Sequence, residues 1–424
     1  MQVEQILADL VRIQSVNPPG GETEVAMYLK RLFDQYGISN EVIEPQKGRG
    51  SFLAYTGEGE RSLLFLSHID VVTATKGWSF PPFSGEIKDG FVFGRGAIDC
   101  KALVAAQACS VISLAQEKKL KGRLIFAATA DEETLGPLGA KYLVDNHIDR
   151  IKADFAINEG AEAPAQVADK VCHFIAVGEK APSWIKLSTR GTSAHGALPM
   201  LGDNAIVKMA DVLKNLANYR PRPALIPVVK ELTKTIAELE SLGSEINENN
   251  IDQYIQNLKN KNFAAYLSAI TRFTVSPNVV HGGLKTNIVP DGCEAEVDIR
   301  ILPGQNKEQI LKELQPFLGD VEIEVINHTS PTISEYKSRY YETIRQTLQE
   351  SVKGDLVLPS ISAGSTDSRL LRAAGIPSYG INMLTLNLDP ALRRSVHGVD
   401  EKIDIDSLKV KTNFLTALAK RYLS

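Results

Sequence analysis

The sequence has little cysteine, no long apolar run and no large excess of charge of either sign. Its four cysteines form no CxxC pair and are too few for a disulfide framework in a chain of 424 residues. No stretch approaches the roughly eighteen uninterrupted apolar residues that would predict a transmembrane helix. The formal net charge of −4 provides no field that would attract nucleic acid or an anionic membrane. A small or peptide-like partner fits this balance better.

The first residues lack the features of a secretion signal. The stretch "MQVEQILADLVRIQS" carries acidic residues among its apolar ones, and it has neither a cationic start nor a small-residue cleavage site. It predicts an amphipathic first helix. Together with the sparse cysteines, this favours a soluble protein in the reducing environment of the cytoplasm.

The chain is too long for one ordinary hydrophobic core, so we expect two domains. Short apolar runs within 62–68, 122–133 and 153–160 have the length of buried strands and end in polar or acidic residues, and a helical pattern covers 101–119. This alternation predicts an α/β domain with a mainly parallel sheet flanked by helices. Ligands of such sheets bind beyond the carboxyl ends of the strands.

The pattern changes near residue 180. The segments 183–191 and 293–304 alternate between polar and apolar residues, which indicates half-buried antiparallel strands. Between them lie an amphipathic helix and a polar stretch at 238–260 that we interpret as a helical excursion. We therefore predict an inserted α+β dimerisation (lid) domain with an antiparallel sheet at 180–302, and a catalytic domain formed by 1–179 and 303–424.

Polar side chains that can bind metal ions follow the predicted strands of the first domain. They are His68, Asp70, Asp99, Asp131, Glu132, Glu133 and Glu159. Carboxylates gathered at one edge of a sheet would repel one another, so a cation is their natural complement. Imidazole and carboxylate ligands without thiolate suit zinc, with cobalt or manganese as alternatives.

Two of these motifs have an ordinary structural explanation as well. In "SHID", Asp70 lies two residues after His68 and can orient its ring. Alternatively, a backbone carbonyl satisfies the histidine and Asp70 caps a turn. Glu132 and Glu133 are adjacent and point in different directions, so that one can bind metal and the other can face a water. An acidic triplet of this kind is, however, more often a solvated loop.

Eight motifs together resemble those of a known family. They are "HID", "GRGAIDCK", "DEE", "NEG", "GTSAHGALPMLGDNAI", "KTNIVP", "GSTDSRLLRAAGIP" and "VHGVDE". Their order and spacing are similar to those of a dinuclear zinc peptidase and deacylase family that includes succinyl-diaminopimelate desuccinylase, acetylornithine deacetylase, aminoacylase and glutamate carboxypeptidase. The similarity spans nearly the whole chain.

The resemblance implies two zinc ions per chain. It assigns Asp99 to bridge them, His68 and Glu159 to complete one site, and Glu133 and His397 to complete the other. Asp70 would support His68. Glu132 would be the general base for a water bound by the metals, which attacks an amide carbonyl. Without the resemblance, we would interpret His397 as a surface histidine.

The resemblance also implies substrate-binding residues and a homodimer. His195 would reach the active site of the partner subunit and stabilise the oxyanion, while Asn287 and Arg300 would bind the substrate carbonyl or carboxylate. Gly364 and Ser365 lie in a loop similar to one that faces the substrate carboxylate. The alternatives are a loop histidine at 195, an ion-paired Arg300 and an ordinary helix start at "GSTD".

Two departures from the common pattern bear on the substrate. Cys100 follows Asp99 where the family often has Asp or Met, at a position that is frequently a cis peptide in relatives. Glu159 in place of Asp resembles the branches whose substrates carry a free carboxylate. We therefore expect a hydrolase of N-acyl amino acids or short peptides. The alternative is a catalytically silent binding or dimerisation module; a phosphoesterase is disfavoured because no GxxxxGK loop is present.

Overall fold

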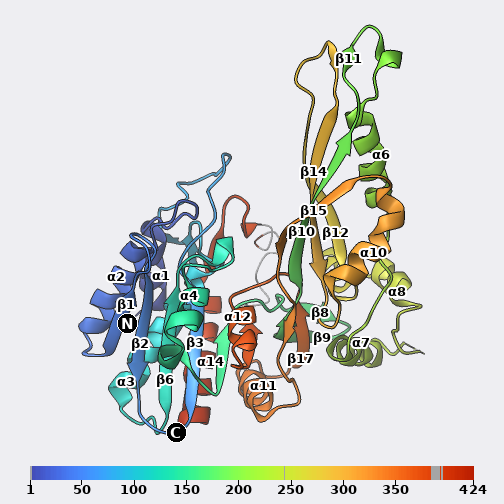
Figure 1. Ribbon diagram of the computed structural model, residues 1–424. Coiled ribbons are helices and arrows are strands. Elements are labelled where there is room, and N and C mark those ends of the chain that lie inside the picture. Colours follow the sequence, from blue (N-terminus) through green and yellow to red (C-terminus); the bar gives the residue numbers. More distant parts are fainter. Residues whose placement is uncertain (1, 243, 383–391, 393–394) are drawn as a thin grey trace.

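The computed structural model describes residues 2–242, 244–382, 392 and 395–424. Figure 1 shows a wide body that contains both ends of the chain and a narrower region that projects from it. Among the helices of the described residues, none is long and apolar enough to cross a membrane.

The elements follow one another in three groups along the chain. Up to residue 179 they are α1 (Val3–Arg12), α2 (Glu22–Asp34), β1 (Ser39–Ile43), β2 (Ser51–Thr56), β3 (Ser62–His68), β4 (Glu86–Lys88), β5 (Phe91–Phe93), α3 (Lys101–Glu117), β6 (Arg123–Thr129), the 3₁₀ helix η1 (Glu132–Thr134), α4 (Ala140–Asn146), α5 (Ile148–Ile151), β7 (Phe155–Asn158), β8 (Ala165–Val167) and β9 (Lys170–Glu179). Up to residue 328 they are β10 (Ala181–Arg190), β11 (Ala194–His195), η2 (Pro199–Leu201), α6 (Ala205–Asn218), α7 (Pro227–Leu239), α8 (Ile251–Asn257), α9 (Lys261–Ile270), β12 (Thr274–Gly282), β13 (Ile288–Val289), β14 (Gly292–Ile301), α10 (Lys307–Leu318) and β15 (Glu322–His328). The last group is β16 (Thr332–Ile333), α11 (Arg339–Ser351), β17 (Leu356–Ser362), α12 (Ser368–Ala373), β18 (Ser378–Ile381), β19 (Lys402–Asp404) and α14 (Ile405–Leu423).

A ten-stranded sheet forms the centre of the wide body. Its order is β1-β2-β6-β3-β7-β18-β9-β16, and β8 and β17 also pair with β9. The central strands β6, β3, β7 and β18 run parallel to their neighbours in this group, whereas β1 and β2 at one edge are antiparallel. The carboxyl ends of β6, β3 and β7 therefore lie next to one another.

Both faces of this sheet are covered by helices. In β3, Leu63 and Phe65 pack in a cluster with residues of α1, α3 and α14, while Leu64 and Leu66 point to the other face and pack with residues of α4, α5 and α12. Each such side chain contributes about 1.5–3 kcal/mol of burial. Burial on both faces explains why these strands are continuous apolar runs, and the predicted α/β class is confirmed.

The projecting region contains a four-stranded antiparallel sheet in the order β12-β14-β10-β15. Along β14 the residues Cys293, Ala295, Val297 and Ile299 alternate with exposed or half-buried polar ones and are buried in a cluster with residues of α6 and α10. The alternating pattern in the sequence indicated this one-sided burial, and the predicted antiparallel sheet is confirmed.

The second sheet continues beyond residue 302. β15 pairs with β10 over residues 322–328, and Leu314 and Leu318 of α10 are buried in the same cluster. The chain then returns to the large sheet through β16, which pairs with β9. No residue of β15 is fully buried, and the adjacent Val325 and Ile326 are both exposed, so its sequence carries only a weak alternating pattern.

The helical excursion packs on the wide body rather than on the second sheet. Apolar residues of α7, α8 and α9 belong to the main core cluster, and the hydroxyl of Tyr266 donates to the carbonyl oxygen of Ile361, 2.9 Å away. α7 therefore lies beside β17, and α9 contacts the end of the same strand through Tyr266.

Candidate metal centre

The predicted metal-binding residues converge at one edge of the large sheet. His68 is the last residue of β3, Glu133 lies in η1 after β6, and Glu159 directly follows β7. Asp99 immediately precedes the start of α3, and His397 comes from the turn before β19. Adjacent parallel strands thus deliver three of the five groups, and two connecting segments deliver the others.

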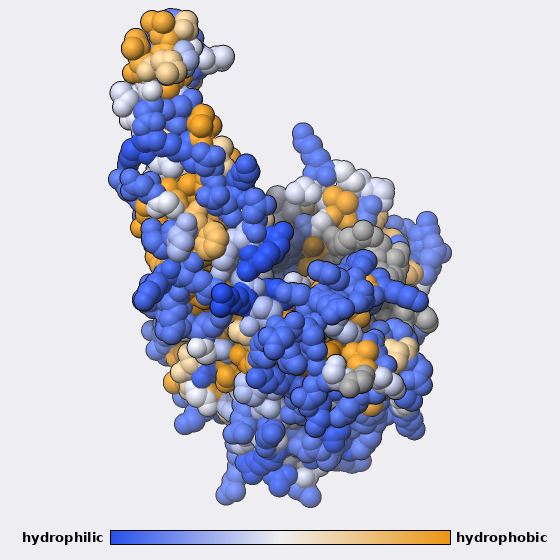
Figure 2. Space-filling model, turned by 90° about the vertical axis from the view of Figure 1, so that its right-hand side faces the viewer, coloured by the Kyte–Doolittle hydropathy of each residue, from blue (hydrophilic) through white to orange (hydrophobic). Residues whose placement is uncertain are grey.

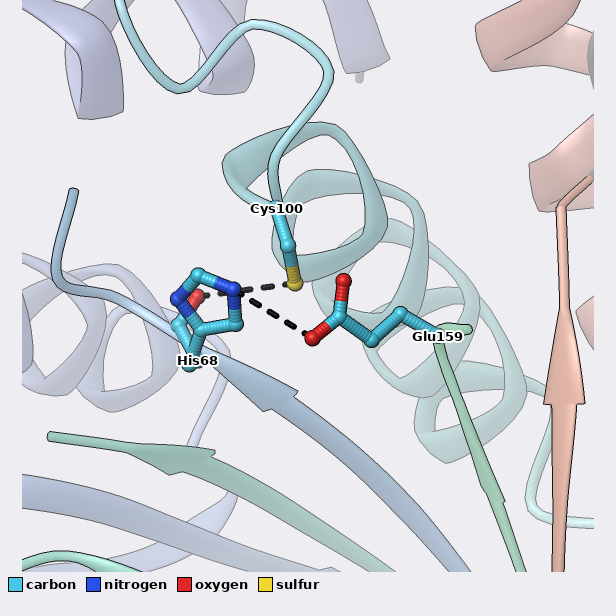
Figure 3. A group of neighbouring side chains, drawn as sticks. All are labelled: His68, Cys100 and Glu159. Carbon is cyan, nitrogen blue, oxygen red and sulfur yellow. Dashed lines mark hydrogen bonds and ion pairs between the residues drawn. The ribbon is translucent and has the colours of Figure 1, made fainter. Parts of the chain in front are cut away.

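Asp99 lies between two histidines. Its Oδ1 is 3.1 Å from Nε2 of His68, and its Oδ2 is 3.2 Å from Nε2 of His397. Nε2 of His68 is also 3.4 Å from Oε1 of Glu159, as Figure 3 shows, and Nε2 of His397 is 3.3 Å from Oε2 of Glu133. The five side chains therefore form two groups that share the carboxylate of Asp99.

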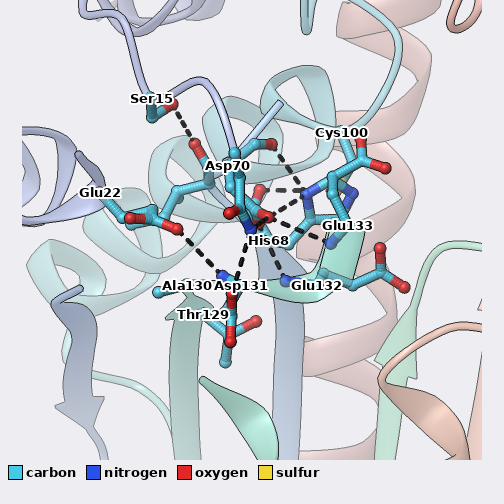
Figure 4. A network of polar contacts seen from close by, with 12 residues as sticks. Ser15, Glu22, His68, Asp70, Cys100, Thr129, Ala130, Asp131, Glu132 and Glu133 are labelled. Atoms are coloured by element: carbon cyan, nitrogen blue, oxygen red, sulfur yellow. Dashed lines mark hydrogen bonds and ion pairs between the residues drawn. The ribbon is translucent and has the colours of Figure 1, made fainter. Parts of the chain in front are cut away.

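Asp70 holds the surrounding backbone in place. Its backbone carbonyl accepts a hydrogen bond from Nδ1 of His68 at 3.0 Å. Its carboxylate accepts from the backbone N–H groups of Glu132 and Glu133, both at 3.1 Å, and from the amide of Asn17 at 2.8 Å. Figure 4 shows this fully buried carboxylate joining the ends of two strands.

A second buried network supports the same loop, and the sequence pattern did not indicate it. Arg49 forms ion pairs with Glu22 and with Asp131, and Glu22 accepts a hydrogen bond from the backbone N–H of Asp131 at 3.2 Å. Asp131 has a left-handed backbone with φ of 71°, which turns the chain into η1. The network thus fixes the turn from which Glu132 and Glu133 project.

Glu401 connects the Asp99 segment to the His397 turn. Its carboxylate accepts from the backbone N–H of Asp99 at 3.1 Å and pairs with Arg95 at 2.6 Å, and Arg95 also donates to the carbonyl oxygen of Gly398. Only the motif "VHGVDE", in which Glu401 is the final residue, pointed to this position. His397 itself remains partly exposed.

Cys100 lies against the first group. The peptide bond between Asp99 and Cys100 is cis, and the buried Sγ is 3.7 Å from the carbonyl oxygen of His68. In Figure 3 the Sγ atom of Cys100 and the carboxylate of Glu159 lie on the same side of the His68 ring. Ligand atoms of two triads lie within 4.8 Å of one another: His68, Cys100 and Glu159, and His68, Asp99 and Glu133.

The pKa values describe a site that needs positive charge. Burial raises the pKa of Glu159 to about 7 and that of Glu132 well above its usual value. Burial would lower the pKa of His68, but the negative groups around it raise the pKa well above its usual value. Hydrogen bonds to Asp99 and Glu133 raise the pKa of His397 to about 10. Protons on the two histidines therefore compensate the carboxylates.

The residues fit a pair of divalent metal ions. Nitrogen and oxygen donors face one another in two groups, which is the ligand chemistry of zinc and of related metals. Oε1 of Glu133 is buried and has no hydrogen-bond partner among the described residues. An unsatisfied buried carboxylate oxygen is unfavourable, and a metal ligand role would satisfy it.

The predicted substrate-binding residues are distributed over both regions. Gly364 lines a cavity of about 340 Å³ together with Asp99 and Glu159, and the neighbouring Ser365 has a buried hydroxyl without a partner in the described structure. Arg300 pairs with Asp298 in the second sheet at 2.9 Å. This contact agrees with the structural alternative for Arg300, and its substrate-binding role stays a prediction.

His195 and Asn287 lie together at the far end of the projecting region. β11 pairs with β13 there, and the backbone N–H of Gly196 donates to the carbonyl oxygen of Asn287 at 2.8 Å. Figure 1 shows this end well away from the carboxyl ends of the central strands. Within the described chain, the structure therefore does not bring His195 to the metal-binding groups.

Comparisons with known proteins agree on one family. The model of peptidase family M20/M25/M40 matches residues 64–421. A probable succinyl-diaminopimelate desuccinylase of Staphylococcus aureus strain MRSA252 is 28% identical over 422 residues, which cover 95% of this chain and 93% of that protein.

Two solved structures illustrate the shared fold. An M20 family metallo-carboxypeptidase from Sulfolobus solfataricus superposes with a TM-score of 0.75 at 20% identity, covering 100% of this chain and 99% of the other. A dinuclear metal-binding peptidase of the M20 family from Bacillus subtilis has a TM-score of 0.62 at 14% identity, with coverages of 98% and 96%.

Proposed function

Because the chain belongs to peptidase family M20/M25/M40, and is therefore a metal-dependent hydrolase, we propose that it hydrolyses the amide bond of N-acyl amino acids or short peptides. The observation that carries this proposal is the position of Asp99 between His68 and His397. One carboxylate facing two imidazoles is suited to bridging two metal ions.

The proposed ligands divide into two sets that share Asp99. His68 and Glu159 hold one ion, and Glu133 and His397 hold the other, with zinc as the proposed metal and cobalt or manganese as functional substitutes. When bound, the ions polarise the scissile carbonyl and make a water more acidic. Asp70 keeps the proton of His68 on Nδ1, so that Nε2 is available as a ligand.

Glu132 is the proposed general base. Its backbone is fixed by the hydrogen bond to Asp70, and burial raises its pKa well above the usual value of a glutamate. A carboxylate with a raised pKa accepts a proton from the attacking water more readily and can return it to the leaving amine. Glu133, one residue further, would be occupied by metal.

We propose that the working enzyme is a homodimer in the cytoplasm. Large apolar side chains are exposed beside His195 at the end of the projecting region, among them Met200 at 92% and Leu284 at 98% exposure. Figure 2 shows a cluster of apolar residues at the tip of this projecting region. A second copy covering this cluster would bury apolar surface and bring His195 to the partner's site, where it would stabilise the oxyanion.

A substrate carboxylate is proposed to bind near Gly364 and Ser365, with Asn287 and Arg300 assisting from the second region. The unpartnered hydroxyl of Ser365 supports this role. The similarity to a probable succinyl-diaminopimelate desuccinylase of Staphylococcus aureus also supports a substrate that carries carboxylates.

The proposal is tested by removing metal with a chelator and adding back zinc, cobalt or manganese, while a panel of N-acyl amino acids and dipeptides is assayed. We expect hydrolysis to disappear with chelator and to return with metal. A matched panel of phosphate monoesters serves as the control and should stay unreacted. Amide hydrolysis that persists without metal would contradict the proposal.

A further inference from the structure

The cavity beside the metal centre contains a buried lysine. Asp99 and Glu159 line this space of about 340 Å³, and Lys411 of α14 lines it as well. Lys411 is 5% exposed, although the neighbouring inward residues of α14 are apolar. Among the described residues that line the cavity, Lys411 alone carries a positive charge.

Lys411 differs from the other buried lysines. The ammonium of Lys101 donates to the carbonyl oxygens of Leu10 and Ile13 at 2.9 and 2.8 Å. The ammonium of Lys180 similarly donates to backbone carbonyls of the segment that precedes β12. Lys411, in contrast, has no hydrogen bond or ion pair with any residue that the structure describes. A buried ammonium without a partner is strongly unfavourable, and the described residues do not supply that partner, so a bound ligand is the natural candidate.

The nearby carboxylates are already engaged. Asp99 and Glu159 belong to the proposed metal ligands, and Glu162 accepts a hydrogen bond from the backbone N–H of Ala163 at 3.0 Å and makes a further interaction. Burial lowers the pKa of Lys411, while charge interactions with Cys100, Glu159 and Asp404 oppose this. The carboxylate of Asp404 accepts hydrogen bonds from the backbone N–H and the hydroxyl of Ser407 at 2.7 and 2.6 Å. Among the described residues, the carboxylates near the ammonium of Lys411 therefore have other partners or are proposed metal ligands.

We propose that Lys411 anchors a carboxylate subsite, in which a carboxylate of the substrate pairs with its ammonium while the scissile amide lies at the metal centre. The subsite rests on the proposed function, because the amide and the carboxylate then belong to one molecule in one cavity. The substrate is thus an amide with a carboxylate in its acyl part or in its amine part. A lysine ammonium and a carboxylate form a charge-assisted hydrogen bond, which provides this selectivity.

Lys411→Met tests the subsite, since methionine has a similar length and no charge. Lys409→Met is the matched control, because Lys409 lies on the same helix with an exposed side chain. Binding to the metal-loaded protein is measured by calorimetry with two pairs of probes. Succinate against butanoate reports on the acyl part, and L-norleucine against norleucinamide reports on the amine part.

The wild-type protein and Lys409→Met should bind the probe with the additional carboxylate about tenfold more tightly in one of the pairs. Lys411→Met should lose this preference, and the affected pair identifies the part of the substrate that carries the carboxylate. If Lys411→Met keeps the preference, or if the wild-type protein has none in either pair, the inference is wrong.

Two further measurements separate the possible failures. Metal content and thermal midpoint establish that Lys411→Met is folded, and Lys411→Gln replaces it if it is not. If amides are hydrolysed but Lys411 does not affect the preference, the subsite fails and the proposed function stands. If the preference depends on Lys411 but no amide is hydrolysed, the proposed function fails and the binding site stands.

Discussion

Asp70 contacts His68 twice. Its carbonyl oxygen accepts a hydrogen bond from Nδ1 at 3.0 Å, and its carboxylate Oδ1 lies 3.4 Å from the same nitrogen. A carbonyl oxygen can only accept, so Nδ1 carries a proton and Nε2 faces Asp99 and Glu159. The same carboxylate holds the backbone of Glu132 and Glu133, so Asp70 connects the proposed ligand His68 to the proposed general base Glu132.

We predict that Asp70→Asn weakens metal binding about 10- to 100-fold, because an amide nitrogen would face a backbone N–H and the support of His68 would weaken. Metal affinity measured by competition with a chelator checks this. Asp355→Asn is the control. Oδ2 of Asp355 lies 2.9 Å from Nε2 of His173, and this pair is away from the metal centre. Equal metal affinity in the two variants would contradict the proposal that Asp70 orients His68 for metal binding.

Glu132→Gln should retain metal and lose about 10²- to 10⁴-fold in kcat, because glutamine cannot accept the proton of the attacking water. Glu133→Gln, one residue along the chain, should instead lose metal. Elemental analysis and steady-state kinetics on both variants distinguish the two roles. A Glu132→Gln variant with wild-type turnover would show that another group is the base.

The stability of the metal-free protein should depend on Glu159. Burial raises its pKa to about 7 in the folded state, above its value in the unfolded chain. The folded protein then holds the proton more tightly, so this contribution to stability is present at low pH and is lost as the pH rises from about 4.5 to 7.

Urea unfolding of the metal-free protein between pH 5 and pH 8 measures this effect. Compared with Glu159→Gln, the wild-type protein should lose stability more steeply as the pH rises toward 7, and added metal should stabilise the wild-type protein more than the variant, because it binds the ionised carboxylate. Identical pH profiles for the two metal-free proteins would rule out a buried carboxyl at this position.

Subunit mixing tests whether His195 acts across a dimer. If each site combines Glu132 of one chain with His195 of the other, a mixed dimer of Glu132→Gln and His195→Ala subunits contains one site with both lesions and one intact site. Random exchange should then restore about a quarter of wild-type activity from two nearly inactive variants. No gain on mixing, with exchange verified, would confine His195 to its own subunit.

The site residues at the strand ends could be predicted from the sequence, but the site residues that come from distant parts of the chain could not. Leu63 to Leu66 are buried on both faces of the sheet, so their apolar run marks a central strand and its end marks His68. Nothing in the local sequence distinguishes His397 from a surface histidine. Its place beside Asp99 depends on long-range folding, and only the resemblance to the family indicated it.

The packing partners of several groups could not be predicted from the sequence either. The apolar faces of α7 and α9 predict helices but not the sheet against which they pack. In the sequence these helices come between two strands of the second sheet, yet they pack in the main core. Arg49 and Glu401 look like surface charges in the sequence because burial of a paired charge leaves no periodic pattern. Such groups become recognisable only when their partners are known.

The central claim is that Asp99 is shared by two metal ions in an amide hydrolase. Stepwise addition of zinc to the metal-free protein, with bound metal and hydrolysis of an N-acyl amino acid measured in the same samples, tests it most directly. We predict about two ions per chain and the appearance of hydrolysis as they bind. Binding of no metal, or hydrolysis that does not change as metal is added, would contradict the account.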